Sequence, residues 1–150
     1  MEKISSLEDH VGYWLRFVSN HVHTAFSAKL SDSGVTVAEW VILRHLFEED
    51  GMPQANLVKI TGLTKGAISK LIDRLDNKKL IVQTISDDDS RAHFIQISKG
   101  GLRLVPKISR LADENDREFF KCLNQRELTL LIDLMRRVVH QNSLQQRPLN

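Results

Sequence analysis

The sequence predicts a mainly α-helical protein that carries one two-stranded β-hairpin. Two observations lead to this fold class. Apolar residues recur at intervals of three and four over most of the chain, as in amphipathic helices. The exceptions are the segments 80–86 and 91–98, which are rich in β-branched and aromatic residues and flank the turn-forming residues "DDDS".

Composition limits the kind of protein that the chain can be. Its 150 residues suffice for one domain, 1–150, and 41% hydrophobic with 27% charged residues are typical of a globular protein. The N-terminal segment is acidic and no apolar run approaches about eighteen residues, so we expect neither a signal peptide nor a membrane span. The single Cys122 cannot form an intrachain disulfide, which suits a reducing compartment. We therefore expect a cytoplasmic protein.

The first two helices are predicted from their apolar spacing and their end signals. Residues 4–30 carry an apolar stripe, formed by Leu7, Val11, Trp14, Leu15, Val18, Val22 and Phe26. The segment "SDSG" at 31–34 ends this helix. Thr36 followed by Glu39 is a capping-box signature, which predicts a second helix over 37–49.

The segment 53–86 combines a basic charge with the pattern of two short helices around a turn. It holds six basic and two acidic residues, although the whole chain has a net charge of only +2. The first helix carries the apolar residues Leu57, Val58 and Ile60. Gly62 can take the positive φ of a sharp turn, and Thr64 can cap the second helix. The segment is therefore predicted to form a helix-turn-helix.

The second helix of this pair has an apolar and a polar face. Its inward positions at i, i+3, i+4 and i+7 are Ile68, Leu71, Ile72 and Leu75. Its cap and outward positions are Thr64, Lys65, Gly66, Ser69, Lys70 and Arg74. They are short at the helix start and cationic along its length, which suits a helix that enters a DNA major groove between two phosphate backbones. Basic residues also occur on ordinary solvated helix faces.

The predicted hairpin extends the helix-turn-helix into a winged helix, so residues 36–97 are expected to form a DNA-binding lobe. Arg91 lies at the tip of the wing, where its guanidinium can enter a narrow minor groove. Phosphates repel the neighbouring carboxylates. We therefore expect Asp89 to bond the turn backbone or to brace Arg91.

The C-terminal part predicts self-association. A helix from Ser98 carries Leu102, Val105, Ile108, Leu111 and Phe119, with a kink expected at Pro106. Asn124 and Glu127 form a second capping box, ahead of Leu128, Leu131, Leu134, Met135 and Val138. A symmetric homodimer through 4–30 and 98–143 would bury these faces and space two recognition helices roughly 34 Å apart.

The order of these elements resembles a known family. "LTKGAISKLIDRLDNKKLI" followed by "DDDSRAHFIQISKGG" is similar to the MarR family of bacterial transcriptional regulators, whose wing carries an Asp-x-Arg motif followed by a Leu-Thr and Gly strand end. The matching positions here are Asp89, Ser90, Arg91, Ile97, Ser98 and Gly101. The resemblance implies a homodimeric, ligand-responsive repressor that binds pseudo-palindromic double-stranded DNA.

Two features depart from the family pattern. The family usually has glycine before the first wing strand, whereas this chain has Lys79. Because a left-handed lysine is strained, this difference favours another kind of helix end. The wing also has fewer basic residues than family wings often have.

The resemblance further implies a cavity for a small aromatic or phenolic effector, between the dimerisation helices and the lobe. The candidate lining residues are His10, Trp14, Phe17, His21, Trp40 and His45. Aromatic residues at helical spacing are also typical of a simple core, so both interpretations stay open.

Other functions remain as alternatives. A winged helix can serve as a protein-docking module without DNA binding. A zinc sensor is disfavoured because no His-x-x-x-His pair lies on one helix face, and a redox role for Cys122 beside Lys121 competes with simple packing late in an apolar helix. The sequence has no GxSxG, Walker-type, GxGxxG or HExxH motif, so we expect no catalytic residue, metal or cofactor.

Overall fold

The protein is mainly helical, as predicted, with a small antiparallel sheet. The structure is a computed structural model and describes residues 4–85, 93–146 and 148–149. Its helices are α1 (Val11–Lys29), α2 (Val37–Glu48), α3 (Gln54–Thr61), α4 (Lys65–Asn77), α5 (Lys99–Phe119) and α6 (Gln125–Gln141). Its strands are β1 (Met52–Pro53), β2 (Ile81–Ile85) and β3 (His93–Ile97), and two short 3-10 turns, η1 (Leu7–Asp9) and η2 (Ser31–Ser33), flank α1.

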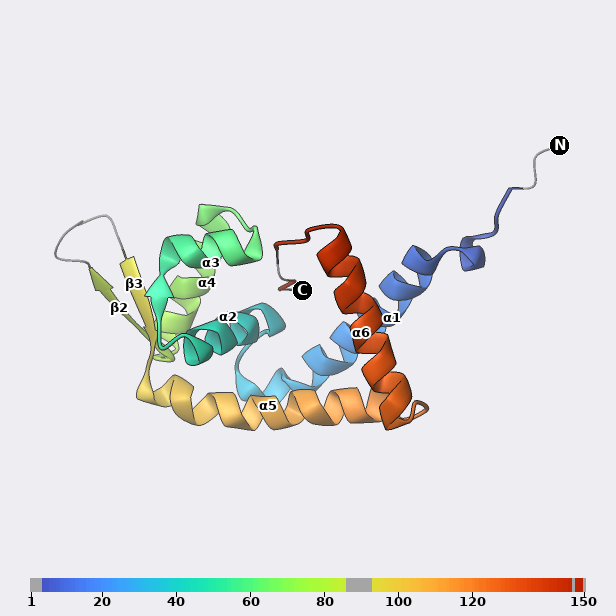
Figure 1. The fold of residues 1–150 in the computed structure, drawn as a ribbon. Helices are drawn as coiled ribbons and strands as arrows, with labels where there is room; N and C mark the ends of the chain where they lie inside the picture. The colour runs from blue at the N-terminus through green and yellow to red at the C-terminus, as the bar shows by residue number, and fades with distance from the viewer. Residues whose placement is uncertain (1–3, 86–92, 147, 150) are drawn as a thin grey trace.

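A lobe made of α2, α3, α4 and the sheet sits at one end of α5 (Figure 1). Its core is formed by buried side chains from all four parts, among them Ile42, Leu43, Leu57, Ile68, Ile72 and Ile95. All four inward positions predicted for the second helix of the helix-turn-helix are buried in α4. The outward face of α4 is therefore fixed by the burial of the opposite face.

The helix ends of the lobe form as their residues predict. The Thr36 hydroxyl accepts a hydrogen bond from the Glu39 amide at 3.2 Å, and the Glu39 carboxylate accepts one from the Thr36 amide at 2.9 Å. Gly62 takes a φ of 70° at the turn between α3 and α4. The Thr64 hydroxyl caps α4 by accepting from the Ala67 amide at 3.2 Å. These three devices confirm the predicted start of α2 and the predicted helix-turn-helix.

The hairpin of β2 and β3 is also confirmed, and it gains a third strand that was not predicted. The sheet order is β1-β3-β2, with both pairings antiparallel. Residue Ile95 pairs with Gln83 of β2 on one side and with Met52 of β1 on the other. The tip of the wing, with Asp89 and Arg91, lies outside the described residues.

The junction between α4 and β2 corrects one expectation. Lys79 does adopt the left-handed conformation, with a φ of 57°. The Leu80 amide donates to the Leu75 carbonyl at 3.0 Å and the Lys79 amide to the Asp76 carbonyl at 2.7 Å. This is the Schellman pair of bonds that usually accompanies glycine. The expected different helix end was wrong because these two bonds hold lysine in the strained conformation.

The start of α5 is bonded directly to this junction. The Ser98 hydroxyl donates to the Lys79 carbonyl at 2.7 Å, and the Ser98 amide donates to the Leu80 carbonyl at 3.0 Å. A Cβ on Gly101 would lie 2.4 Å from the Leu80 carbonyl oxygen, so this close approach requires glycine. The end of α4, the wing and α5 therefore meet at one joint.

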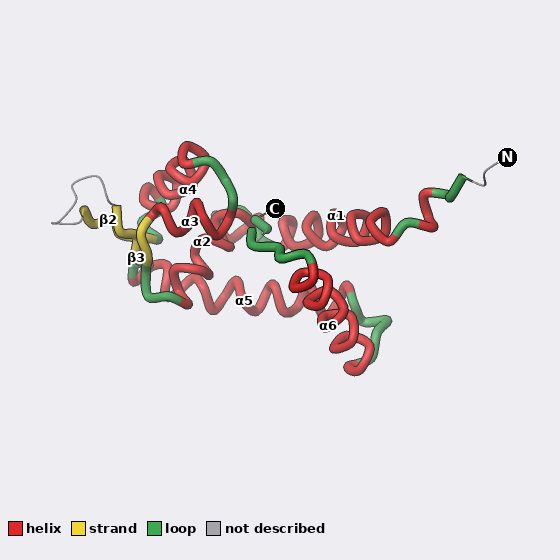
Figure 2. The backbone as a smooth tube through the Cα atoms, turned by 45° about the horizontal axis from the view of Figure 1, so that its top comes forward, coloured by secondary structure: helices red, strands yellow, loops and turns green. Residues whose placement is uncertain are grey.

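The remaining helices extend away from the lobe (Figure 2). The C-terminal half of α1 packs on α5, where the Asn115 amide donates to the Val22 carbonyl at 3.3 Å and Lys29 pairs with Glu118 at 2.8 Å. α5 continues through Pro106 as one helix. No side chain of α6 is buried, and its exposed apolar residues are Leu130, Ile132, Leu134, Met135, Val138 and Val139.

Candidate nucleic-acid interface

The outward face of α4 is open and basic. Lys65, Lys70 and Arg74 are exposed along this face. Gly66 is exposed near the helix start, and a Cβ placed there would meet nothing within 4 Å. The first turn of α4 therefore has room to approach another surface closely, with cationic side chains further along the helix.

Ser69 is half-buried and tied to the preceding helix. Its hydroxyl accepts a hydrogen bond from the Gln54 side-chain amide at 2.8 Å. Because Gln54 is the first residue of α3, this bond fixes the start of α3 against the exposed face of α4. The Ser69 hydroxyl proton stays available for an outside acceptor. Gln54 was not among the predicted site residues, since no local pattern reveals a partner fifteen positions away.

A buried carboxylate holds α4 against α2. Glu39 is 0% exposed. Its Oε2 lies 2.7 Å from the Lys78 ammonium, and its Oε1 lies 3.3 Å from Arg74 Nε. The contact with Arg74 has ion-pair distance without hydrogen-bond geometry, so Oε1 has no hydrogen-bond donor among the described residues. The single charge of Glu39 is thus paired with two cations, Arg74 of α4 and Lys78 directly after α4.

This anchor changes the expected role of Arg74. The sequence predicted Arg74 as a DNA contact and predicted no protein partner for it. In the structure, its Nε is directed to Glu39. More than half of the side chain remains exposed, at 56%, so the far side of its guanidinium can still bind a phosphate. The sequence revealed only the capping function of Glu39, because Arg74 lies 35 positions further along the chain.

The predicted effector residues lie in two groups. Trp14, Phe17 and His21 are exposed on α1, where the Phe17 and His21 rings stack with centroids 4.6 Å apart. Exposed His10 occupies the N-cap position of that helix, and its side chain makes no capping hydrogen bond. Trp40 and His45 are buried on α2, and Trp40 belongs to the core of the lobe.

The hollow between α1, α2 and α4 is lined by other residues. It has a volume of about 480 Å³, and its lining includes His23 and Ser27 of α1, Val37 of α2, and Lys70 and Arg74 of α4. None of the six predicted effector residues lines this hollow. The assignment of those six residues to a ligand cavity stays a prediction.

The sensing alternatives can be placed on the structure. Cys122 is exposed in the turn between α5 and α6, so of the two alternatives for this residue the packing inside a helix is wrong. Among the residues that the structure describes, no three His, Cys, Asp or Glu side chains group closely enough to hold a metal ion. No described helix is both long and apolar enough to cross a membrane.

The helix-turn-helix, the hairpin that follows it and the exposed basic face of α4 define a winged-helix DNA-binding protein. The family model described as "MarR family" matches residues 33–92, which contain α2, α3, α4 and β2. Over residues 33–92 the chain is therefore similar to the MarR family of transcriptional regulators, the family that its motifs resemble.

Curated relatives and solved structures agree with this assignment. The transcriptional regulator HosA of Escherichia coli O157:H7 is 24% identical, over 79% of this chain and 87% of the relative. The HTH-type transcriptional regulator MhqR of Bacillus subtilis is 23% identical, over 89% and 81%. Both of these relatives are named as regulators rather than enzymes.

Two solved structures show the same fold. The structure of BpsR from Bordetella bronchiseptica, described by its regulation by 6-hydroxynicotinic acid, matches with a TM-score of 0.78 and 25% identity, covering 85% of this chain and 97% of that one. MarR of Escherichia coli in complex with operator DNA matches with a TM-score of 0.78 and 21% identity, covering 86% and 93%.

Proposed function

We propose that the protein is a homodimeric repressor of transcription that binds pseudo-palindromic promoter DNA and responds to a small effector. The exposed basic face of α4, presented by a buried opposite face, is the observation that carries this proposal. A protein with this role acts on the chromosome in the bacterial cytoplasm. Catalysis, a cofactor and a metal ion have no part in it.

In the proposed complex, the start of α4 enters the major groove. Thr64, Lys65, Gly66 and Ser69 lie at that end, where short side chains permit a close approach to base edges. Lys70 and the free side of Arg74 bind backbone phosphates. Arg91 enters the minor groove and Asp89 braces it, as the sequence predicts.

The dimer is proposed to form through residues 4–30 and 98–143, with residues 36–97 as the DNA-binding lobe. The exposed apolar face of α6 supports this division, because a single chain leaves all of its side chains at least partly in water. Leu7, Val11 and Leu15 are further exposed apolar side chains, in the N-terminal part of the chain. A symmetric partner buries both faces in a self-complementary interface.

A small aromatic or phenolic effector is proposed to control DNA binding. The description of BpsR names such a compound, 6-hydroxynicotinic acid, as a regulator of that protein's DNA binding. In this chain, Lys70 and Arg74 of α4 line the hollow between α1, α2 and α4. A ligand bound there would contact the helix that is proposed to bind DNA. His10, Trp14, Phe17, His21, Trp40 and His45 remain the proposed effector residues for the assembled dimer.

A titration against promoter DNA tests the DNA contacts. Purified protein is mixed with the DNA upstream of its own gene across a salt series, next to Lys70→Ala, Arg91→Ala and the control Lys121→Ala. Lys70→Ala should weaken binding to all sequences and reduce the salt slope by about one, because one phosphate contact is lost. Arg91→Ala should cost roughly 1–3 kcal/mol and relax the preference at the flanks of each half-site.

The same titration separates the alternatives. Lys121 is exposed in the turn between α5 and α6, so its loss should leave the affinity unchanged. If Lys70→Ala and Arg91→Ala both bind like the wild type, the groove contacts are wrong. If the wild type binds no promoter fragment in a salt-dependent manner, a protein-docking role replaces the proposed one.

A further inference from the structure

The segment that follows α6 turns back towards the DNA-binding lobe. Directly after α6, Ser143 takes the left-handed conformation, with a φ of 50°. The Ser143 amide donates to the His140 carbonyl at 3.1 Å, and the Leu144 amide donates to the Val139 carbonyl at 3.0 Å. These are the two bonds of a Schellman helix end, after which the chain changes direction. The described residues that follow, 144–146 and 148–149, are called the tail, and they lead from α6 to the lobe (Figure 1).

The tail contacts the turn of the helix-turn-helix. A Cβ on Gly62 would overlap the side-chain amide of Gln146, whose Oε1 and Nε2 both lie 2.6 Å from the position of that Cβ. The amide of Gln146 therefore lies directly against the backbone of the turn, in space that a larger residue would fill. Gly62 comes two residues before Thr64, the N-cap of α4. The contact is thus next to the start of the helix that is proposed to enter the major groove.

The tail also buries one of its two leucines. Leu149 is 6% exposed and belongs to the apolar cluster that contains the core of the lobe. Leu144 is 55% exposed, although it lies in the same tail. Pro148 has a fixed φ next to Leu149, which lowers the conformational entropy that the tail loses when it docks. The tail therefore binds the rest of the chain through particular side chains, Gln146 and Leu149.

We propose that the tail is a strap that docks on the lobe at the turn between α3 and α4 and ties α6 to the recognition helix. α5 leads from the lobe to α6, and the tail leads from α6 back to the lobe, so these parts form a closed frame (Figure 1). A lobe that is held at two points has less freedom to move against α6 than a lobe held by α5 alone. The effect of the strap on DNA binding rests on the proposed function, whereas its docking does not.

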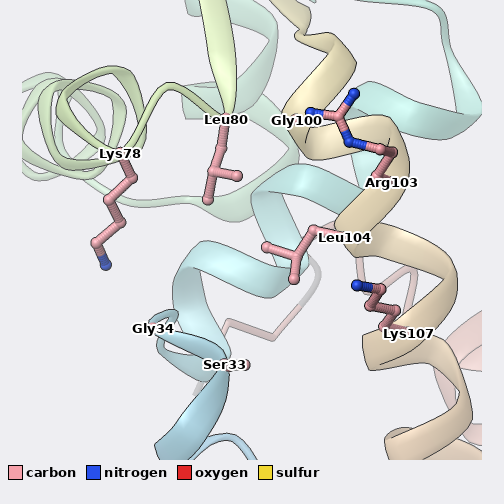
Figure 3. Close-up of a pocket in the computed structure, with 8 residues that line it drawn as sticks. All are labelled: Ser33, Gly34, Lys78, Leu80, Gly100, Arg103, Leu104 and Lys107. Carbon is pink, nitrogen blue, oxygen red and sulfur yellow. The ribbon is translucent and has the colours of Figure 1, made fainter.

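The other end of α4 is held by different contacts. Leu80, after α4, lines a hollow together with Leu104 and Lys107 of α5 (Figure 3), and none of the described tail residues lines it. The Leu80 amide donates to the Leu75 carbonyl at 3.0 Å. Loss of the strap should therefore loosen the turn at Gly62 and leave the Leu80 amide protected. These two amides give one measurement with its own internal control.

Hydrogen exchange of the full chain tests whether the strap holds the turn. The Gly62 amide donates to the Val58 carbonyl at 2.9 Å, so its exchange reports opening of the turn. Leu149→Asp should speed this exchange about tenfold or more, because a carboxylate does not stay in an apolar cluster. The exchange of Leu80 should not change. Leu144→Asp is the matched control and should change neither amide.

A peptide added to the protein tests the docking site directly. The recipient is the full chain with Leu149→Asp, and the probe is a fluorescein-labelled peptide of residues 143–150, SLQQRPLN. The peptide should bind saturably in fluorescence anisotropy and slow the exchange of Gly62 again. It should bind the wild type about tenfold more weakly, because the attached tail competes at a high effective concentration. Leu149→Asp in the peptide should weaken its binding about tenfold or more, whereas Leu144→Asp should not.

Any of three results would overturn the strap. These are unchanged exchange of Gly62 in Leu149→Asp, the same increase in Leu144→Asp, and a peptide that does not bind or binds equally well with Leu149→Asp. If Leu149→Asp is unfolded by circular dichroism, Leu149→Ala replaces it, with a smaller change expected in the same direction.

Dilution separates the chain's own tail from that of a partner subunit. In the wild type, protection of the Gly62 amide should be the same at protein concentrations above and below those at which subunits dissociate, because the strap docks within one chain. If dilution removes the protection, the tail docks on the partner subunit and a strap within one chain is wrong.

A promoter titration then tests the link to DNA binding. Leu149→Asp should weaken promoter binding about fivefold relative to the wild type, because a lobe held by α5 alone loses more freedom when it binds. An unchanged affinity would disprove this link. Since the exchange and peptide experiments contain no DNA, a protein that binds no promoter can still confirm or refute the strap.

Discussion

Replacement of Glu39 by glutamine tests the ion pairs that hold α4 against α2. Glutamine fits the capping box as well as glutamate does, so the bond to the Thr36 amide is retained. The substitution removes the charge that holds Lys78 at 2.7 Å and Arg74 at 3.3 Å. Its effect on stability therefore reports the ion pairs separately from the helix cap.

The expected loss is about 1–2 kcal/mol. A hydrogen bond to a charged group contributes roughly 1.5–3 kcal/mol. Two features reduce this figure here. Lys78 and Arg74 have side-chain exposures of 37% and 56%, so water can solvate both after the anchor is lost. Removing a fully buried charge also relieves part of its desolvation cost. Glu39→Ala should lose roughly a further 0.5–1.5 kcal/mol, because the hydrogen bond from the Thr36 amide to the Glu39 carboxylate is then lost as well.

Urea unfolding at a fixed protein concentration measures the effect, and Glu48→Gln is the matched control. Glu48 pairs with Arg44 one turn away on the exposed side of α2, where such pairs contribute roughly 0.3–0.5 kcal/mol. Glu39→Gln should lower the urea midpoint clearly more than Glu48→Gln and lower the melting temperature by roughly 2–8 °C. Equal midpoints for the two variants would show that the ion pairs of Glu39 add no more stability than the exposed pair of Glu48 and would refute the expected loss.

Three further predictions concern the helix junctions and the dimer. Lys79→Gly should stabilise the protein by about 0.5–1 kcal/mol in the same urea assay, because glycine relieves the left-handed strain at a φ of 57°; a lower midpoint would contradict this account. Met135→Asp should dissociate the homodimer in analytical ultracentrifugation, whereas Thr129→Asp, a polar position of α6, should leave it intact; a dimeric Met135→Asp protein would disprove the proposed interface. The hydrogen bond from Lys29 lowers the pKa of Glu118, so this pair stabilises the contact of α1 with α5 above the usual glutamate pKa, and the contribution is lost as the pH falls through the lowered value. The urea midpoints of wild type and Glu118→Gln should therefore differ at neutral pH and converge in acid. A difference that stays the same at every pH would show that the Lys29–Glu118 pair does not cause it.

The sequence predicted those parts of the fold that local spacing determines. The capping boxes at Thr36 and Asn124, the positive φ of Gly62 and the buried face of α4 all depend on residues within one or two turns of each other. Such signals remain visible in a single sequence, because neighbouring residues in a helix meet at fixed intervals. The hairpin was predicted from another local signal, two segments rich in β-branched and aromatic residues on either side of four turn-forming residues.

The parts that were missed depend on residues far apart in the chain. β1 has two residues, one of them Pro53, and exists only because it pairs with β3 more than forty positions later. The ion pairs of Glu39 with Arg74 and Lys78 connect α2 with α4 and its C-terminal end, and the hollow between α1, α2 and α4 is lined by residues from distant parts of the chain. Lys79 was mispredicted because its strain energy was considered without the two hydrogen bonds that oppose it.

The length of α5 has a consequence for which operators the protein can occupy. Its 21 residues, at a rise of about 1.5 Å each, make it roughly 31 Å long, close to one turn of DNA. One end is bonded to the wing and α4, and the other leads into α6, so in the proposed dimer α5 sets the distance between the DNA-binding lobe and the dimer interface. Inserting one residue into α5 would rotate one end of this helix against the other by about 100°. The two copies of α4 in the proposed dimer would then no longer match the helical repeat of the DNA. In the proposed dimer, the spacing between operator half-sites therefore depends on the number of residues in α5, a helix that supplies none of the proposed DNA contacts.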